Sequence, residues 1–263
     1  MRRTTSLAAI GLTVLTGVAS AAASTPSVPD WSGTWVNITG LYFSNPGTFR
    51  PLQNAGQGTN LPPLKPEYEK RWRDTMAASA RGEPTKDSGA ECGWPGVPSG
   101  NLSPMPQEIL ITRDRVAILS EFTGGFRLIY TDGRKLPEDF DPSYNGFSTG
   151  RWEGDTLVVD TVGLRGDYQL ELSGVEHSDQ LTVQERIRKV APDLMENEIT
   201  MTDPGAFTKP WKATVKYRRL PAGEPGSRLI EYVCSDNNRN GVGADGSTYT
   251  LGPDGKPLTG PTQ

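Results

Sequence analysis

From residue 108 to residue 234, turn residues divide the chain into short segments rich in β-branched and aromatic side chains. Three connections, around Asp114, Gly124 and Gly154, are short enough for hairpins, so successive segments should pair as antiparallel strands. We interpret the following segments as strands: 108–112, 116–122, 126–131, 147–153, 156–164, 181–190, 194–203, 211–220 and 229–234. With a further strand around Trp35 the total is about ten, a number at which a twisted sheet curls or closes. The sequence therefore predicts a mainly β fold, an antiparallel meander that forms a barrel or a strongly curved sheet.

One segment, residues 65–81, has the period of a helix. Tyr68, Trp72 and Met76 follow one another at intervals of four residues, and Pro66 suits the first turn. Elsewhere the 30 glycines and 22 prolines favour many turns and short strands over long helices. We expect a single N-terminal helix.

The first residues have the pattern of a secretory signal. Arg2 and Arg3 precede an apolar stretch at 7–18, and small residues follow, with cleavage expected after Ala21 or Ala23. This predicts a signal peptide over 1–23 and a periplasmic or secreted protein. No later segment approaches the apolar length that spans a bilayer, so no membrane insertion is expected.

The remaining chain is divided by composition into three further parts. Residues 24–107 form a Pro/Gly-rich segment that contains the helix, and residues 108–236 form the antiparallel β domain. Residues 237–263 have almost no apolar side chains, which is typical of a flexible tail.

The two cysteines, Cys92 and Cys234, are expected to form a disulfide bond because an exported protein folds under oxidising conditions. A reactive thiol pair is the alternative, although the chain has no Cys-x-x-Cys spacing.

The charge pattern and the motifs exclude several functions. A net charge of −4 without a basic run argues against nucleic acid and against an anionic membrane surface. One histidine and two cysteines leave no conventional zinc or copper set, and nucleotide-binding and serine-hydrolase motifs are absent. The run from Asp236 resembles the start of a calcium loop, but Ser247 stands where such a loop has glutamate. We therefore expect no metal and no cofactor.

Three residues are candidates for catalysis: His177, Glu185 and Asp160. His177 is the chain's one histidine, and a solvated loop position is the alternative to a catalytic role. Asp160 interrupts a nearly continuous apolar strand, so we expect it to be desolvated, either as a scaffold residue or as an acid with a raised pKa.

Glu185 lies on the apolar face of its predicted strand, which it shares with Leu181, Val183 and Ile187. A carboxylate in that position must be paired or protonated, and a structural ion pair is the alternative to a catalytic role. Its possible partners are Arg127, Arg134, Arg151 and Lys209.

A long loop at 135–146 follows the Asp132-Gly133-Arg134 turn and contains Tyr144. Loops at a barrel mouth often carry function. We expect Asp132, Arg134, Tyr144 and Trp152 to bind the substrate, with simple aromatic packing as the alternative for Tyr144 and Trp152.

Six runs of the sequence are distinctive when taken together: Thr131-Asp132-Gly133-Arg134, Gly150-Arg151-Trp152-Glu153-Gly154-Asp155-Thr156-Leu157-Val158-Val159-Asp160-Thr161, His177-Ser178, Glu185-Arg186, Thr208-Lys209-Pro210-Trp211 and Glu231-Tyr232-Val233-Cys234. With these runs the chain resembles a widespread group of uncharacterised exported bacterial proteins. The likeness covers most of the chain after Glu108 and implies export, but no particular activity. The N-terminal run Asp30-Trp31-Ser32-Gly33-Thr34-Trp35 resembles the opening of lipocalin-like barrels.

Two functions of different classes follow. The first is a cofactor-free acid–base enzyme of lyase, isomerase or hydrolase type that acts on a small organic molecule, with His177 moving a proton. The alternative is a non-catalytic, lipocalin-like small-molecule binding protein; an envelope interaction protein is a third. An enzyme requires His177 and a carboxylate within hydrogen-bond reach at a cleft, whereas a carrier requires a roomy apolar cavity. The sequence leaves the oligomeric state open.

Overall fold

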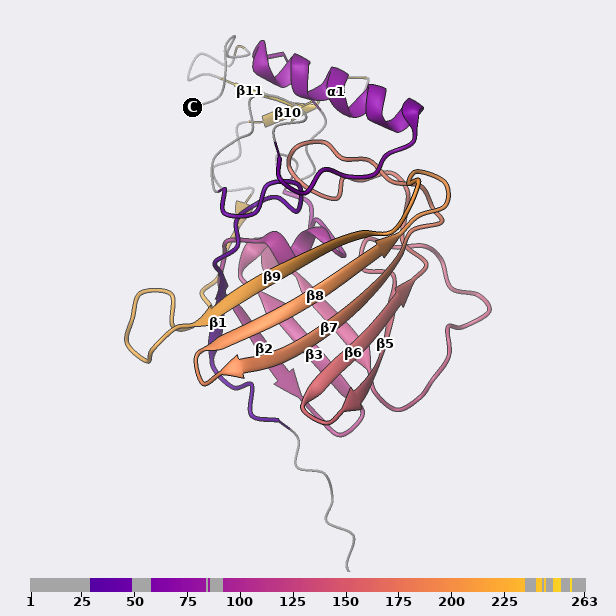
Figure 1. The fold of residues 1–263 in the computed structure, drawn as a ribbon. Coiled ribbons are helices and arrows are strands. Elements are labelled where there is room, and N and C mark those ends of the chain that lie inside the picture. Colours follow the sequence, from indigo (N-terminus) through magenta and orange to yellow (C-terminus); the bar gives the residue numbers. More distant parts are fainter. Residues whose placement is uncertain are drawn as a thin grey trace, which may run out of the picture.

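The computed structural model describes residues 29–48, 58–83, 85, 92–234, 240–242, 244, 248–251 and 256. The predicted signal peptide and Asp236 lie outside these residues. In the described chain, nine strands form a closed barrel in which each strand neighbours the next one along the sequence (Figure 1). Their bounds are β1 (Thr34–Asn37), β2 (Gln107–Ile111), β3 (Arg115–Ser120), β4 (Phe126–Tyr130), β5 (Phe147–Glu153), β6 (Thr156–Val162), β7 (Thr182–Ala191), β8 (Leu194–Thr202) and β9 (Trp211–Arg219).

The barrel closes where β1 pairs with β9, in the register Val36 to Arg218. This confirms the predicted barrel and excludes the open curved sheet. It also explains why the strand predicted at 229–234 is wrong, since residues 229–233 are coil and Cys234 is in a 3₁₀ turn. Strand β9 pairs with β1 on one side and with β8 on the other, so it has no free edge for a further strand.

The pairing of β4 with β5 corrects the antiparallel meander. These two strands are parallel, with Ile129 beside Ser148, while the other eight pairs around the barrel are antiparallel. Strand direction must return to its starting value after one circuit, so a ring of nine pairs needs at least one parallel pair. The long loop at 135–146 makes this possible, because it carries the chain back along the barrel before β5 begins.

Alternation along the strands sorts side chains between the interior and the solvent. In β7, Val183, Glu185 and Ile187 are buried while their neighbours are exposed, as the sequence predicts. Large apolar side chains such as Leu157 and Ile199 fill much of the interior. Complete burial of each such side chain contributes roughly 1.5 to 3 kcal/mol.

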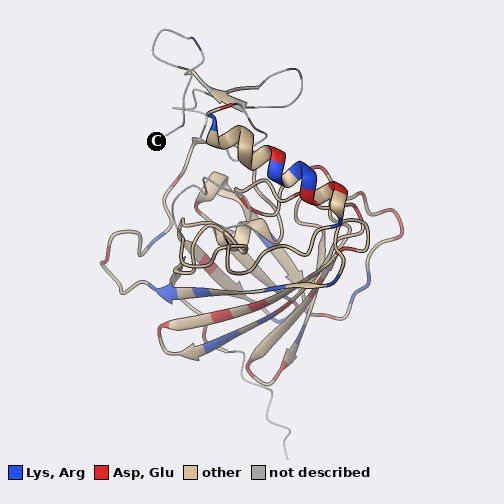
Figure 2. Ribbon diagram, turned by 45° about the horizontal axis from the view of Figure 1, so that its top comes forward, with Lys and Arg blue, Asp and Glu red and all other residues tan. Residues whose placement is uncertain are grey.

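The single predicted helix is confirmed as α1 (Pro66–Ala80), which lies across one end of the barrel (Figure 1). Trp72 and Met76 on its inner face are buried, and the indole N–H of Trp72 donates to the Ser173 hydroxyl at 3.2 Å. Charges of both signs alternate along the outer face of the helix, including the Lys70–Asp74 ion pair (Figure 2). No helix in the described residues is long and apolar enough to cross a bilayer.

The predicted disulfide is present between Cys92 and Cys234, whose Cα atoms are 5.5 Å apart. It joins the coil before β2 to the coil after β9 across 142 residues of sequence.

Within the predicted flexible tail, β10 (Asn240–Val242) and β11 (Thr248–Thr250) pair as a small antiparallel sheet. The predicted tail therefore contains regular structure at these residues. The Thr-Tyr-Thr sequence of β11 has the β-branched and aromatic composition of a strand, although it is too short to show a period.

Candidate binding site at the barrel mouth

A buried ion pair occupies the barrel interior. The Glu185 carboxylate is 0% exposed and the Arg127 side chain 4%, and the guanidinium donates to both carboxylate oxygens. Arg127 also donates to the hydroxyls of Ser148 and Thr161, at 3.2 and 3.0 Å. Of the four basic partners considered for Glu185, the structure selects Arg127.

Two amides complete this network. Asn197 on β8 donates to Glu185 Oε1 at 2.8 Å, and Asn101 donates to the same oxygen at 3.0 Å. Asn101 belongs to the short 3₁₀ helix η1 (Ser99–Leu102), which reaches into the end of the barrel. Burial alone would raise the pKa of the Glu185 carboxyl, but Arg127, with these amides, outweighs that cost and holds the pKa below its usual value.

Inside the barrel, a cavity of about 20 Å³ lies beside Asn101, Asn197 and Tyr217. That volume suits about one water molecule. Among the described residues, the roomy interior expected of a lipocalin-like carrier is therefore not found, because large side chains fill much of the barrel.

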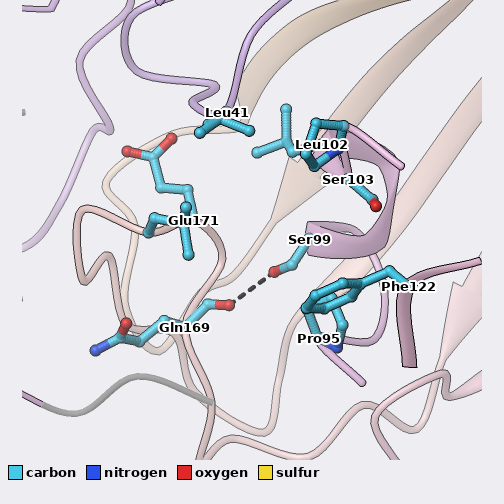
Figure 3. A pocket seen from close by; sticks show the side chains of 10 residues that line it. Leu41, Pro95, Ser99, Leu102, Ser103, Phe122, Gln169 and Glu171 are labelled. Carbon is cyan, nitrogen blue, oxygen red and sulfur yellow. Dashed lines mark hydrogen bonds between the residues drawn. The ribbon is translucent and has the colours of Figure 1, made fainter. Parts of the chain in front are cut away.

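A larger pocket, of about 220 Å³, lies at the barrel mouth. Segments far apart in sequence form its walls: the coil after β1, the coil on both sides of η1, the 3₁₀ turn η2 (Phe122–Gly124) and the loop after β6. Figure 3 shows Leu102 and Phe122 on one side of the cavity and Gln169 and Glu171 on the other. The lining residues are mostly apolar: Leu41, Pro95, Ser99, Leu102, Ser103, Pro104, Phe122, Gln169, Glu171 and Leu172.

The wall after β6 is a small hairpin, residues 169–176, called here the mouth hairpin. Its ends pair through the Gln169–Glu176 bridge, and Leu170 N donates to Val175 O at 2.8 Å. The Ser99 hydroxyl donates to the Gln169 carbonyl at 2.7 Å and so links η1 to the hairpin (Figure 3).

Glu171 fixes the mouth hairpin to the coil after β1. Its carboxylate is buried and accepts hydrogen bonds from the Ser44 N–H at 2.9 Å and from the hydroxyls of Ser44 and Ser173. Burial raises the pKa of Glu171, and these uncharged donors offset only part of that cost. No described basic side chain pairs with Glu171, so it serves as an anchor for the hairpin rather than as half of an ion pair.

Helix α1 supports the mouth hairpin from outside. The Arg71 guanidinium pairs with Glu176 at 2.8 Å, and a Cβ added to Gly174 would lie 2.7 Å from the Thr75 side chain. This close approach requires glycine at position 174, where φ is +83°.

The structure places the three predicted catalytic residues in separate environments. Glu185 is inside the barrel, His177 follows the mouth hairpin, and Asp160 is on the outer barrel surface. No described hydrogen bond or ion pair joins any two of them, and none lines the mouth pocket. These three residues therefore do not form one acid–base site.

Asp160 is not desolvated as predicted. Its side chain is 47% exposed and pairs with Arg151 at 3.0 Å, and it accepts from Gln184 at 2.9 Å. The prediction for Asp160 was wrong because the apolar run includes Val158, which faces outward like Asp160 but is completely buried. The cross-strand neighbours of Val158 are Arg151 and Arg186, and the long aliphatic stems of arginine cover such a side chain.

His177 is not a solvated loop residue, since it is only 2% exposed. Its Nδ1 lies 2.8 Å from the Ser178 carbonyl oxygen. Its ring packs edge to face on Tyr168, and the two ring centroids are 4.5 Å apart. Burial lowers the pKa of His177, against the effect of the Ser178 carbonyl and of nearby carboxylates.

The residues predicted to bind substrate do not gather at the mouth pocket. Asp132 and Arg134 form a partly exposed ion pair at 2.5 Å, Tyr144 packs on Tyr168, and Trp152 packs on Trp31. The pocket residues were missed because η1 and its flanking coil have no hydrophobic period. The only available signal was Glu171, a carboxylate between Leu170 and Leu172.

Comparison with solved structures gives a distant likeness. No family model matches the chain, and no curated protein matches it. Among solved structures the chain is similar to the wild-type fluorescent protein UnaG, at 15% identity over 44% of this chain and 72% of that one, with a TM-score of 0.27. The strand pairing of this chain itself establishes the barrel.

Proposed function

We propose that this protein is a non-catalytic small-molecule binding protein, and that it holds a small, mostly apolar molecule in the mouth pocket. One observation carries the proposal: an apolar pocket of about 220 Å³ lies at the mouth of a barrel whose interior is filled. A cavity of about 150 Å³ in another protein holds benzene, so this pocket suits a ring system or a short acyl chain. The separation of His177, Glu185 and Asp160 favours binding over acid–base catalysis.

We further propose that the protein acts outside the cytoplasm, in the periplasm or as a secreted protein. The Cys92–Cys234 disulfide suits an oxidising compartment. The predicted signal peptide and the resemblance to exported bacterial proteins support the same location.

Binding can be tested with the fluorescent probe N-phenyl-1-naphthylamine, which is apolar and uncharged near neutral pH. Leu172 lines the pocket and is 56% exposed, so Leu172→Asp alters the pocket without removing a core residue. Leu110→Asp is the matched control, because Leu110 is 49% exposed on β2 and does not line the pocket. Loss of the apolar contact should weaken probe binding roughly 10- to 200-fold in Leu172→Asp alone. Absence of binding to the unaltered protein, or equal losses in both variants, would refute the proposal.

A further inference from the structure

The mouth hairpin is closed by two aromatic rings, one at each end. Tyr168 immediately precedes the hairpin and His177 immediately follows it, and their ring centroids are 4.5 Å apart. The Tyr168 hydroxyl donates to the carbonyl of Val97, two residues before η1 begins. The ring pair therefore connects both walls of the pocket: the hairpin and the segment that leads into η1.

The hydrogen-bond partners of His177 suit an uncharged ring. A carbonyl oxygen only accepts hydrogen bonds, so Nδ1, which faces the Ser178 carbonyl at 2.8 Å, carries the proton of the neutral imidazole. Nε2 is then an unprotonated acceptor, and it is buried without a hydrogen-bond partner among the described residues.

A proton added to Nε2 would find no free acceptor among the residues that the structure describes. The carboxylates that act on His177 are those of Asp203, Asp167 and Glu176. Asp167 is paired with Arg165 and Glu176 with Arg71, both across partly exposed ion pairs. On the turn after β8, Asp203 accepts from the Ser178 N–H and hydroxyl and from two backbone N–H groups in its own turn.

Tyr168, whose ring packs on His177, provides no anion either. Burial raises the pKa of Tyr168, which stays neutral. The Ser178 carbonyl and these already paired carboxylates therefore compensate a buried imidazolium only in part, so protonation of His177 costs free energy.

We propose that His177 is a pH-sensitive latch: a proton taken from solvent onto its Nε2 breaks the ring contact with Tyr168, frees the mouth hairpin and releases the bound molecule. The release step rests on the proposed function of the pocket. Because the pKa of His177 is lower in the closed structure than in an open one, the closed hairpin is fully favoured above about pH 6.5. The preference for the closed hairpin is lost as the pH falls from about 6.5 toward the lower pKa that His177 has in the closed structure.

The latch can be tested without any ligand, because a chain with one histidine gives one imidazole Cε1–H signal in proton NMR. The pH midpoint of that signal should lie below about 6.5, and the backbone amide signals of Gln169, Leu172 and Ser99 should shift with the same midpoint. In His177→Gln, which cannot titrate, the amide shifts with that midpoint should disappear. A midpoint at or above about 6.5, or hairpin signals that do not follow it, overturns the proposal. If His177→Gln fails to fold, the unaltered protein alone still decides between these outcomes.

Release is measured with N-phenyl-1-naphthylamine at about pH 8 and about pH 5.5. The dissociation constant of the unaltered protein should rise severalfold at the lower pH, up to about tenfold, which is the limit for one group with an open-state pKa of about 6.5. The dissociation constant of His177→Gln should stay nearly constant. Tight binding that is equal at both pH values overturns the latch and leaves the binding function standing. Failure to bind at about pH 8 refutes the binding function instead, and the NMR titration then decides whether His177 controls the hairpin.

Discussion

Replacing Glu185 with glutamine should lower the free energy of unfolding by about 3 to 5 kcal/mol, the usual cost of leaving one buried charge without its partner. The structure explains the size of the loss. Arg127 is 4% exposed and donates to both Glu185 oxygens, so the variant leaves a buried guanidinium with only the hydroxyls of Ser148 and Thr161 as acceptors. The new amide must also turn its NH₂ group toward other donors, from Arg127 or from Asn101 and Asn197.

The double variant Arg127→Met with Glu185→Leu should recover much of the lost stability, because it removes both charges and leaves neither of them unpaired. Urea unfolding followed by tryptophan fluorescence, with the disulfide intact, measures both effects. The matched control is Glu153→Gln on neighbouring β5. Its side chain is 43% exposed and pairs with Arg186 at the barrel surface, so little change is expected.

The pH dependence supplies a second measurement. The folded-state pKa of Glu185 is below its unfolded value, so the contribution of its charge is present above about pH 4.3 and lost as the pH falls through the folded-state value. The stability difference between the unaltered protein and Glu185→Gln should therefore narrow in acid. A loss below about 1 kcal/mol at neutral pH, or a loss no larger than that of Glu153→Gln, would refute this account of the interior.

Three further predictions follow from local structure. Denatured, unreduced protein should show no free thiol, and reduction of Cys92–Cys234 should lower the unfolding free energy by up to roughly 4 to 5 kcal/mol in the chain-entropy model. Gly96→Ala should reduce the melting temperature more than Gly154→Ala; both residues have positive φ, but only at Gly96 would a Cβ meet backbone, 2.1 Å from a carbonyl oxygen. Asp160→Asn should leave probe binding and melting temperature nearly unchanged because its side chain is 47% exposed, and a large loss of either would restore a role for it.

Much of the barrel was predictable because local patterns determine it. A period of two along β7 places Glu185 among apolar side chains, and short turns between the segments require neighbouring strands to pair. The helix follows in the same way from the spacing of Tyr68, Trp72 and Met76. The burial of Glu185 could therefore be predicted from the sequence, and so could its need for a partner.

The identity of that partner could not be predicted. Arg127 and Glu185 are 58 residues apart in sequence and meet only because the closed barrel turns both side chains inward from β4 and β7. Asp160 shows the opposite error, since a continuous apolar run suggested two covered faces where the outer face is covered only at Val158.

By itself, the sequence determined the nine strands of the barrel, the helix, the disulfide partners and the buried carboxylate, because each depends on neighbouring residues or on a count of residue types. Only the tertiary structure decided the parallel β4–β5 pair, the filled interior and the mouth pocket. Closure of the barrel constrains the directions and the side-chain positions of all nine strands at once. The sequence of a single segment does not show that constraint. The pocket walls come from coil, where backbone hydrogen bonds and the Glu171 anchor fix the chain without a hydrophobic period. The role proposed for His177 likewise depends on the tertiary structure, which buries its ring against Tyr168.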